Sequence, residues 1–102
     1  MNRLYPLLFE PNLHEVVWGG NRLRPFKGMS PDARPIGESW EVSAVPSSAS
    51  VVSNGCWAGK SLVDVIDAMP EEILGGSVAA EYSGKLPLLV KFIDAEKDLS
   101  IQ

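Results

Sequence analysis

Cysteine and histidine are scarce in this sequence. The 102-residue chain has one cysteine, Cys56, and one histidine, His14. A single cysteine cannot form an internal disulfide, and no second cysteine or histidine lies near enough in the sequence to suggest a metal site or a nucleophile paired with a base. We therefore expect a reducing, cytoplasmic location, a packing role for Cys56 and a solvated or capping role for His14.

Long hydrophobic runs, a basic excess and a glycine-rich phosphate loop are also absent. The longest apolar stretch, LPLLV, is far too short to span a bilayer, and the N-terminal MNRLYPLLFEPNL lacks the sustained apolar core of a signal peptide. The formal net charge is −4, whereas nucleic acids and anionic membranes select basic surfaces. We expect no nucleic-acid partner, no membrane association and no export.

Proline and glycine, by contrast, are frequent. Eight prolines and nine glycines divide the chain into short pieces, and its length permits one domain at most. Short apolar runs between such breaks are typical of strands, so we expect a mainly β fold with one or two short helices. The expected elements are strands at 5–9, 14–18, 36–45 and 86–93, a hairpin turn at Asn54-Gly55, a long polar loop at 19–35, and a last strand at 98–102.

One helix is well defined by its pattern. Ser61 can cap it, because Asp64 follows three residues later. The apolar residues of this stretch fall on one stripe, which we expect to be core: Leu62, Val65, Ile66 and Met69. A second short helical turn is expected to begin at Pro70 and to end at Gly75.

Two charged residues interrupt apolar patterns. Lys91 lies inside the run LPLLVKFI, where an unpaired ammonium would be costly to bury. It either reaches solvent at a sheet edge or faces an anion in a cleft. Glu38 shares a strand face with Trp40, which makes it a candidate general acid or base, or an acceptor for a metal or a sugar hydroxyl. A carboxylate at the wet end of its strand is the alternative.

Polar side chains also alternate at the end of the chain. Ser100 and Gln102 project from one face of the expected strand 98–102. An unpaired edge at this strand would permit self-association with another chain. Elsewhere, Trp18 precedes two glycines, an arrangement found both in ligand pockets and in ordinary hairpin corners.

Three stretches carry a resemblance to a known family: YPLLFEPNLHEVVWGGNRL, IGESWEVS and LPLLVKFIDAEKDLSIQ. In this order and spacing they resemble the start of the type I phosphomannose isomerases, zinc enzymes of the cupin superfamily, and in particular the shorter bacterial branch. The resemblance spans essentially the whole chain. It implies that residues 1–102 are the N-terminal portion of a cupin-type β-sandwich, or jelly roll, incomplete at its C-terminal end.

The resemblance also implies roles for the residues singled out above. In the family the strand ending at Gln102 continues as Val-His-Pro, and Gln102 is implied to be the first of four zinc ligands. The other three ligands have no counterpart in this sequence. Glu38 and Lys91 are implied to lie in the pocket as catalytic residues, with Lys91 also a candidate for holding the substrate phosphate. Trp18 is implied to form the pocket wall, and Ser100 to lie near the phosphate.

The implied reaction is the interconversion of mannose 6-phosphate and fructose 6-phosphate, an aldose–ketose shift through a cis-enediol with zinc polarising the sugar oxygens. One glutamine is too weak a zinc site, because several ligands must be fixed together. We therefore expect the 102-residue chain alone to be inactive. The alternatives are a non-catalytic cupin-like module that binds a sugar phosphate or a protein partner, and an enzyme of the same superfamily acting on a related sugar.

Overall fold

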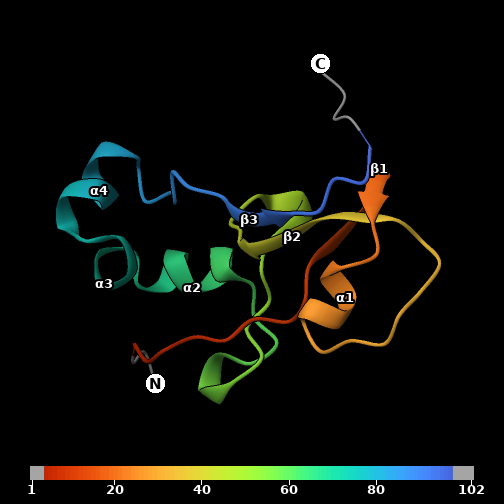
Figure 1. The fold of residues 1–102 in the computed structure, drawn as a ribbon. Helices are drawn as coiled ribbons and strands as arrows, with labels where there is room; N and C mark the ends of the chain where they lie inside the picture. The colour runs from red at the N-terminus through yellow and green to blue at the C-terminus, as the bar shows by residue number, and fades with distance from the viewer. Residues whose placement is uncertain (1–3, 98–102) are drawn as a thin grey trace. The chain divides into compact units, whose positions relative to one another are not determined.

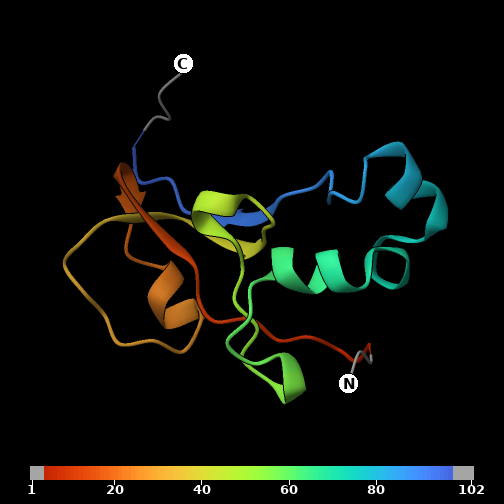
Figure 2. The same ribbon diagram turned by 180° about the vertical axis from the view of Figure 1, so that it is seen from behind.

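The computed structural model describes residues 4–97 of the chain. It divides the chain into two compact units, the first formed by Met1–Glu10 and Val42–Val90 and the second by Pro11–Glu41 and Lys91–Gln102. Figures 1 and 2 show the secondary structure from opposite sides. Its elements are β1 (Leu13–Gly20), α1 (Leu23–Phe26), β2 (Ile36–Val42), the 3-10 turns η1 (Pro46–Ser48) and η2 (Gly55–Trp57), α2 (Leu62–Ala68), α3 (Pro70–Leu74), α4 (Gly76–Glu81) and β3 (Val90–Ile93).

The second unit is built on a three-stranded sheet with the order β1-β2-β3. β1 runs antiparallel to β2, and His14 lies directly opposite Glu38. The pairing becomes irregular further along, because Glu15 and Gly20 both align with Ile36. The expected strands at 14–18 and 36–45 are thus confirmed, with β1 two residues longer and β2 three residues shorter at their C-terminal ends.

Three glycines allow the backbone of the second unit to approach itself closely. A Cβ atom at Gly19 would lie 2.5 Å from the backbone nitrogen of Gly37, and a Cβ atom at Gly37 would lie 2.5 Å from the ring of Trp18. At Gly20 a Cβ atom would lie 2.6 Å from the carboxylate of Asp94. None of the three has a positive φ angle, so these positions need glycine for lack of space.

Residues 19–35 are not one long loop, contrary to expectation. β1 continues to Gly20, and α1 follows after two residues. Leu23 anchors this short helix because its side chain is buried, with 5% of its surface exposed. The longer irregular segment is Lys27 to Pro35, and Figure 2 shows it running outward from α1 before it returns to β2.

The first unit has its core along α2, as the apolar stripe predicts. The hydroxyl of Ser61 accepts a hydrogen bond of 3.1 Å from the backbone N–H of Asp64 and caps the helix. The stripe residues are at most 3% exposed: Leu62, Val65, Ile66 and Met69. The expected second turn is α3, and α4 is a further short helix that the sequence analysis missed.

The predicted strand at 5–9 is wrong in extent, because only Phe9 pairs, in an antiparallel bridge with Val52. The predicted hairpin is present with a longer connection than a tight turn at Asn54-Gly55, because Val51 pairs antiparallel with Ser61. The side-chain oxygen of Asn54 accepts a hydrogen bond from the backbone N–H of Leu8 (2.8 Å), and its amide donates to the carbonyl of Pro6 (3.0 Å). The asparagine therefore takes the backbone groups that a neighbouring strand would use. Gly55 begins η2, which forms part of the connection between the paired residues Val51 and Ser61.

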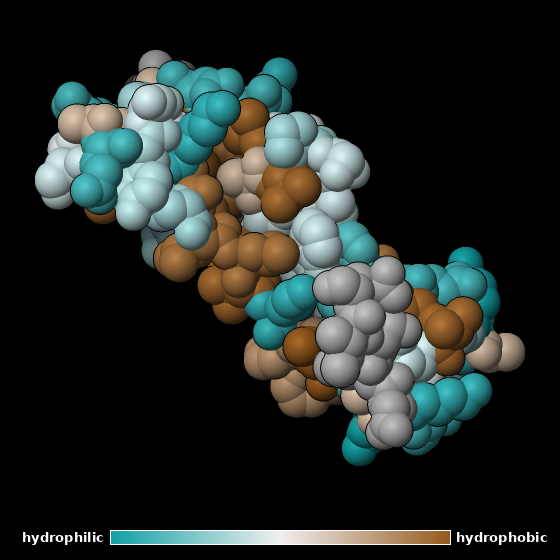
Figure 3. All heavy atoms as spheres, turned by 90° about the horizontal axis from the view of Figure 1, so that it is seen from above, coloured by the Kyte–Doolittle hydropathy of each residue, from teal (hydrophilic) through white to brown (hydrophobic). Residues whose placement is uncertain are grey.

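The prediction of a buried strand at 86–93 is wrong in extent and in burial. β3 begins only at Val90, after Pro87 has interrupted the run, and all four of its residues are exposed. β3 lies at the edge of the sheet order, where fewer neighbours cover its side chains. Figure 3 shows hydrophobic side chains, in brown, at the surface of the molecule.

No helix within residues 4–97 combines the length and apolar character needed to cross a bilayer.

We predict that Gly37→Ala destabilises the second unit by about 1–3 kcal/mol, the range found for overpacking. The added methyl group would collide with the side chains of Trp18 and Val16, which both lie on β1. Urea unfolding followed by tryptophan fluorescence measures the loss. Gly76→Ala is the matched control, because its methyl group meets no atom within 4 Å and α4 gains a better helix former. Equal stability of the two variants would contradict the steric argument.

Candidate functional site

The sheet of the second unit brings two of the predicted site residues together. Glu38 on β2 and Lys91 on β3 form an ion pair, with 3.1 Å between the ammonium nitrogen and Oε1 of the carboxylate. Their side chains are 18% and 34% exposed, so the pair is partly shielded from water while still accessible. The position of Lys91 at a sheet edge and its pairing with an anion, which the sequence left as alternatives, therefore occur together.

Two aromatic residues complete this group, which we call the Glu38 cluster: Glu38, Lys91, Trp40 and His14. The indole N–H of Trp40 donates a hydrogen bond of 2.7 Å to Oε1 of Glu38. The imidazole of His14 stacks on the Trp40 ring, with 4.0 Å between centroids and 16° between planes. The Lys91 ammonium lies over the same ring, 5.8 Å from its centroid. His14 is thus half-buried in a stack, whereas the sequence favoured a solvated or capping role.

The electrostatics of the cluster keep Glu38 ionised. The hydrogen bond from Trp40 lowers the pKa of the Glu38 carboxyl most strongly, and the hydrogen bond and charge of Lys91 lower it further. Partial burial acts in the opposite direction, and His14 adds a smaller lowering effect. The net result is a pKa below the ordinary value, so at neutral pH Glu38 is a hydrogen-bond acceptor.

The two oxygens of Glu38 are used unequally. Trp40 and Lys91 both donate to Oε1, while Oε2 has no hydrogen-bond partner among residues 4–97. A carboxylate oxygen accepts readily from a hydroxyl group, and the Lys91 ammonium has further N–H donors for an oxygen of a ligand. The cluster can therefore bind a polyhydroxylated or anionic small molecule.

Trp18 lies at the end of β1, with its ring against Gly37. Its carbonyl accepts backbone hydrogen bonds from Glu96 and Lys97, which follow β3. Side chains alternate across a strand, so Gly37 faces away from the side of β2 that carries Glu38. Within the described residues no hydrogen bond or ring contact joins Trp18 to the Glu38 cluster, and its role as pocket wall stays a prediction.

Ser100 and Gln102 lie outside the described residues, as does the strand expected at 98–102. Their roles near the phosphate and at zinc therefore stay predictions, as does self-association through that edge. Among residues 4–97 no three histidine, cysteine, aspartate or glutamate side chains converge to hold a metal ion.

The sequence analysis missed Asp94, the most buried carboxylate among the described residues of the second unit. It is 4% exposed, and Oδ1 accepts from Nε of Arg22 (2.8 Å) while Oδ2 accepts from the Arg22 backbone N–H (2.9 Å). The Arg22 guanidinium also forms an ion pair with Oδ1. Burial alone would raise the pKa of Asp94, but the Arg22 hydrogen bonds and charge outweigh it and lower the pKa. The sequence signal that could have identified Asp94 is its place directly after the apolar run that ends at Ile93.

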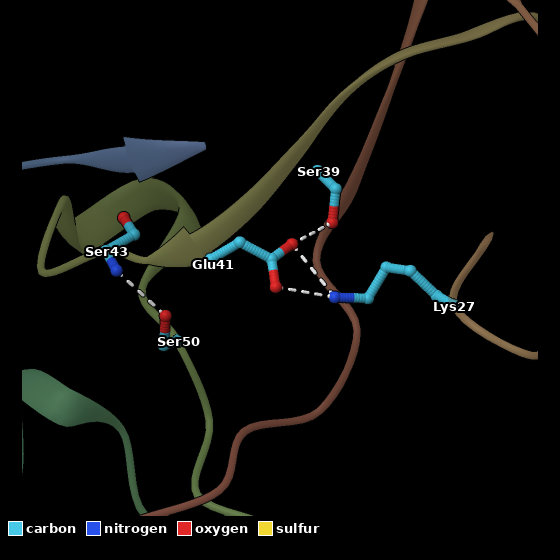
Figure 4. A network of polar contacts seen from close by, with 5 residues as sticks. All are labelled: Lys27, Ser39, Glu41, Ser43 and Ser50. Carbon is cyan, nitrogen blue, oxygen red and sulfur yellow. Dashed lines mark hydrogen bonds and ion pairs between the residues drawn. The ribbon is translucent and has the colours of Figure 1, made fainter. Parts of the chain in front are cut away.

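A second ion pair that the sequence analysis missed lies on the other face of β2, which carries Ser39 and Glu41. The Lys27 ammonium contacts both oxygens of Glu41, at 2.7 and 2.9 Å, and the Ser39 hydroxyl donates to Glu41 at 2.5 Å (Figure 4). Ser39 is fully buried, whereas the side chains of Lys27 and Glu41 are 21% and 24% exposed. Burial raises the pKa of Glu41, and its two donors together lower it below the ordinary value.

Comparison with known proteins assigns the family. Residues 7–102 match the model of the phosphomannose isomerase type I catalytic domain. The chain belongs to this family. The mannose-6-phosphate isomerase of Streptococcus mutans is 39% identical over 97 residues, which cover 95% of this chain and 29% of the relative. The Bacillus subtilis protein named "Probable mannose-6-phosphate isomerase GmuF" is 43% identical over 99 residues, covering 96% of this chain and 30% of the relative.

A solved structure agrees with this assignment. The mannose 6-phosphate isomerase from Bacillus subtilis superimposes with a TM-score of 0.71 at 33% identity, over 88% of this chain and 27% of that one. The predicted fold class, a mainly β arrangement of the cupin type with short helices, is thereby confirmed, as is the resemblance to type I phosphomannose isomerases. This member of the family spans less than a third of the length of these relatives.

We predict that Asp94→Asn lowers the free energy of unfolding at pH 7 by about 1–3 kcal/mol, because hydrogen bonds to a charged group are lost. The folded-state pKa of Asp94 lies below the ordinary value of 3.8, so its contribution is present above that pH and is lost as the pH falls through the folded-state pKa. Unfolding measured from pH 7 down to 2 should therefore show a weaker acid dependence in the variant. Asp67→Asn, at an exposed position of α2, is the control; an equal loss there would contradict the prediction.

Proposed function

We propose that this chain supplies part of the sugar-phosphate pocket of a mannose-6-phosphate isomerase, which interconverts mannose 6-phosphate and fructose 6-phosphate. The observation that carries the proposal is the Glu38–Lys91 pair, in which Oε2 of Glu38 accepts no hydrogen bond from the described part of the chain. Support comes from the family assignment and from relatives that are named mannose-6-phosphate isomerases. A cytoplasmic location agrees with this function and stays a prediction.

Glu38 is best suited to accept a hydrogen bond from a sugar hydroxyl. An aldose–ketose shift needs a group that moves a proton between neighbouring carbons, and such a base works best when its pKa lies near the working pH. The pKa of Glu38 is held below its ordinary value, which makes its carboxylate a weak base. We therefore assign Glu38 to orienting the sugar and not to carrying the proton.

Lys91 is suited to donate to an oxygen of the substrate. Its ammonium is already paired with the carboxylate of Glu38. A dianionic phosphate would give the ammonium a second favourable charge contact, in addition to any contact with the sugar hydroxyls. The proposal keeps Trp18 as pocket wall and Ser100 near the phosphate, as the family resemblance implies.

Zinc, when bound, would polarise the sugar oxygens as a Lewis acid. The described residues do not fit a zinc site by themselves, because no suitable group of three donors converges within residues 4–97. Gln102 is the one ligand that the resemblance assigns to this chain. The roles proposed for Glu38 and Lys91 accordingly need no contact with the metal.

A hybrid enzyme tests the proposal. The segment of the Streptococcus mutans isomerase that matches this chain is replaced by residues 1–102, and conversion of mannose 6-phosphate is measured. We expect an active hybrid in which Glu38→Gln and Lys91→Met each lower kcat/KM by about 10- to 100-fold, the value of a hydrogen bond to a charged group.

Glu72→Gln and Lys60→Met are matched controls, because both side chains are exposed and lie in the first unit. Activity of the Glu38 and Lys91 variants equal to that of the controls would contradict the assigned roles. An inactive but folded hybrid, together with stoichiometric binding of mannose 6-phosphate by the 102-residue chain, would favour a non-catalytic binding module instead.

We also predict that the isolated 102-residue chain loses added zinc during dialysis and does not isomerise mannose 6-phosphate. A tetrahedral site needs several ligands held together, and this chain is assigned one. Metal analysis after dialysis and a coupled assay check both statements. Zinc retained at one equivalent, or measurable turnover, would show that the chain holds a complete site.

A further inference from the structure

Trp40 contacts each of the other three members of the Glu38 cluster. Its indole N–H reaches Glu38, its ring stacks on His14, and the Lys91 ammonium lies over that ring. We propose that Trp40 is a positioning residue that holds Oε1 of Glu38 and so presents Oε2 to the substrate, with His14 holding the indole ring in place. This inference rests on the proposed function, because it assigns the device that orients the pocket carboxylate.

The geometry of the hydrogen bonds supports this role. A carboxylate on a flexible side chain can rotate, and either oxygen could face the Lys91 ammonium. An indole has a single N–H donor in a fixed direction, so its bond of 2.7 Å selects one oxygen. Lys91 donates to that same oxygen at 3.1 Å, so within residues 4–97 the other oxygen is left for a ligand.

The stack explains why a tryptophan can serve here without itself binding the sugar. Aromatic rings bind sugars when a ring face is free, but His14 covers one face of Trp40 at 4.0 Å and Lys91 lies over the ring. His14 comes from β1 directly opposite Glu38, so the sheet register that pairs the strands also positions the stack. Trp40 is thereby engaged with protein groups on its ring as well as at its nitrogen.

The test uses the 102-residue chain without substrate. Carbon-13 NMR of the glutamate carboxyl groups gives the pKa of Glu38 in the wild-type chain and in Trp40→Phe. Phenylalanine keeps a ring for His14 and Lys91 but has no N–H, so we expect the pKa of Glu38 to rise from its lowered value towards the ordinary one. A residue that only filled space would leave that pKa unchanged.

Trp57→Phe is the matched control. The indole nitrogen of Trp57 is buried and has no hydrogen-bond partner among the described residues, and Trp57 lies in the first unit. Its replacement removes an N–H that bonds to nothing, and we expect no change in the pKa of Glu38. The same rise in both variants, or no rise in Trp40→Phe, would overturn the proposal.

A second measurement needs no substitution and therefore no assumption about folding. In the wild-type chain the indole N–H resonance of Trp40 should titrate with the pKa of Glu38, while that of Trp57 should not. A Trp40 resonance that is insensitive to Glu38 would overturn the proposal. The activity of the hybrid enzyme tests the proposed function separately, so an inactive hybrid would leave this NMR result to decide the role of Trp40.

Discussion

The close approach of β1 and β2 is the constraint on which the second unit depends. Gly19 and Gly37 leave no room for a side chain where the two strands meet, and a β-carbon at either position would overlap its neighbour. This contact leaves the Trp18 ring against Gly37 on one side of β2. At the other end of the pairing, His14 comes opposite Glu38, and the functional cluster is built from that register.

Three acidic side chains in this unit share one electrostatic arrangement. Glu38, Glu41 and Asp94 each lie next to a cation, and each has a pKa below its ordinary value. The arrangement keeps all three ionised at neutral pH, which favours binding and orientation over proton transfer. The carboxylates differ in how far they are exposed to solvent, and their roles differ accordingly. Asp94 is buried and links the end of β3 to Arg22, while Glu38 has one oxygen that no residue of 4–97 occupies.

The family assignment and the cluster geometry support each other at different levels. Fold and family concern the chain as a whole, and they follow from the match over residues 7–102 and from the solved relative. The assignment of roles rests on individual contacts, because a shared fold does not by itself fix what a side chain does. Trp40 illustrates the difference, since its importance follows from three contacts and not from its sequence motif alone.

The sequence by itself determined the family, the mainly β class and the helix α2, because a capping serine and an apolar stripe are local signals that need no distant partner. It also identified Glu38 and Lys91 as charged residues that interrupt apolar patterns. Their pairing was decided only by the tertiary structure, since 53 residues separate them and no local pattern specifies the register of β2 against β3. The same reason hid the link between Arg22 and Asp94 and the hydrogen bonds of Asn54 to the segment 5–9.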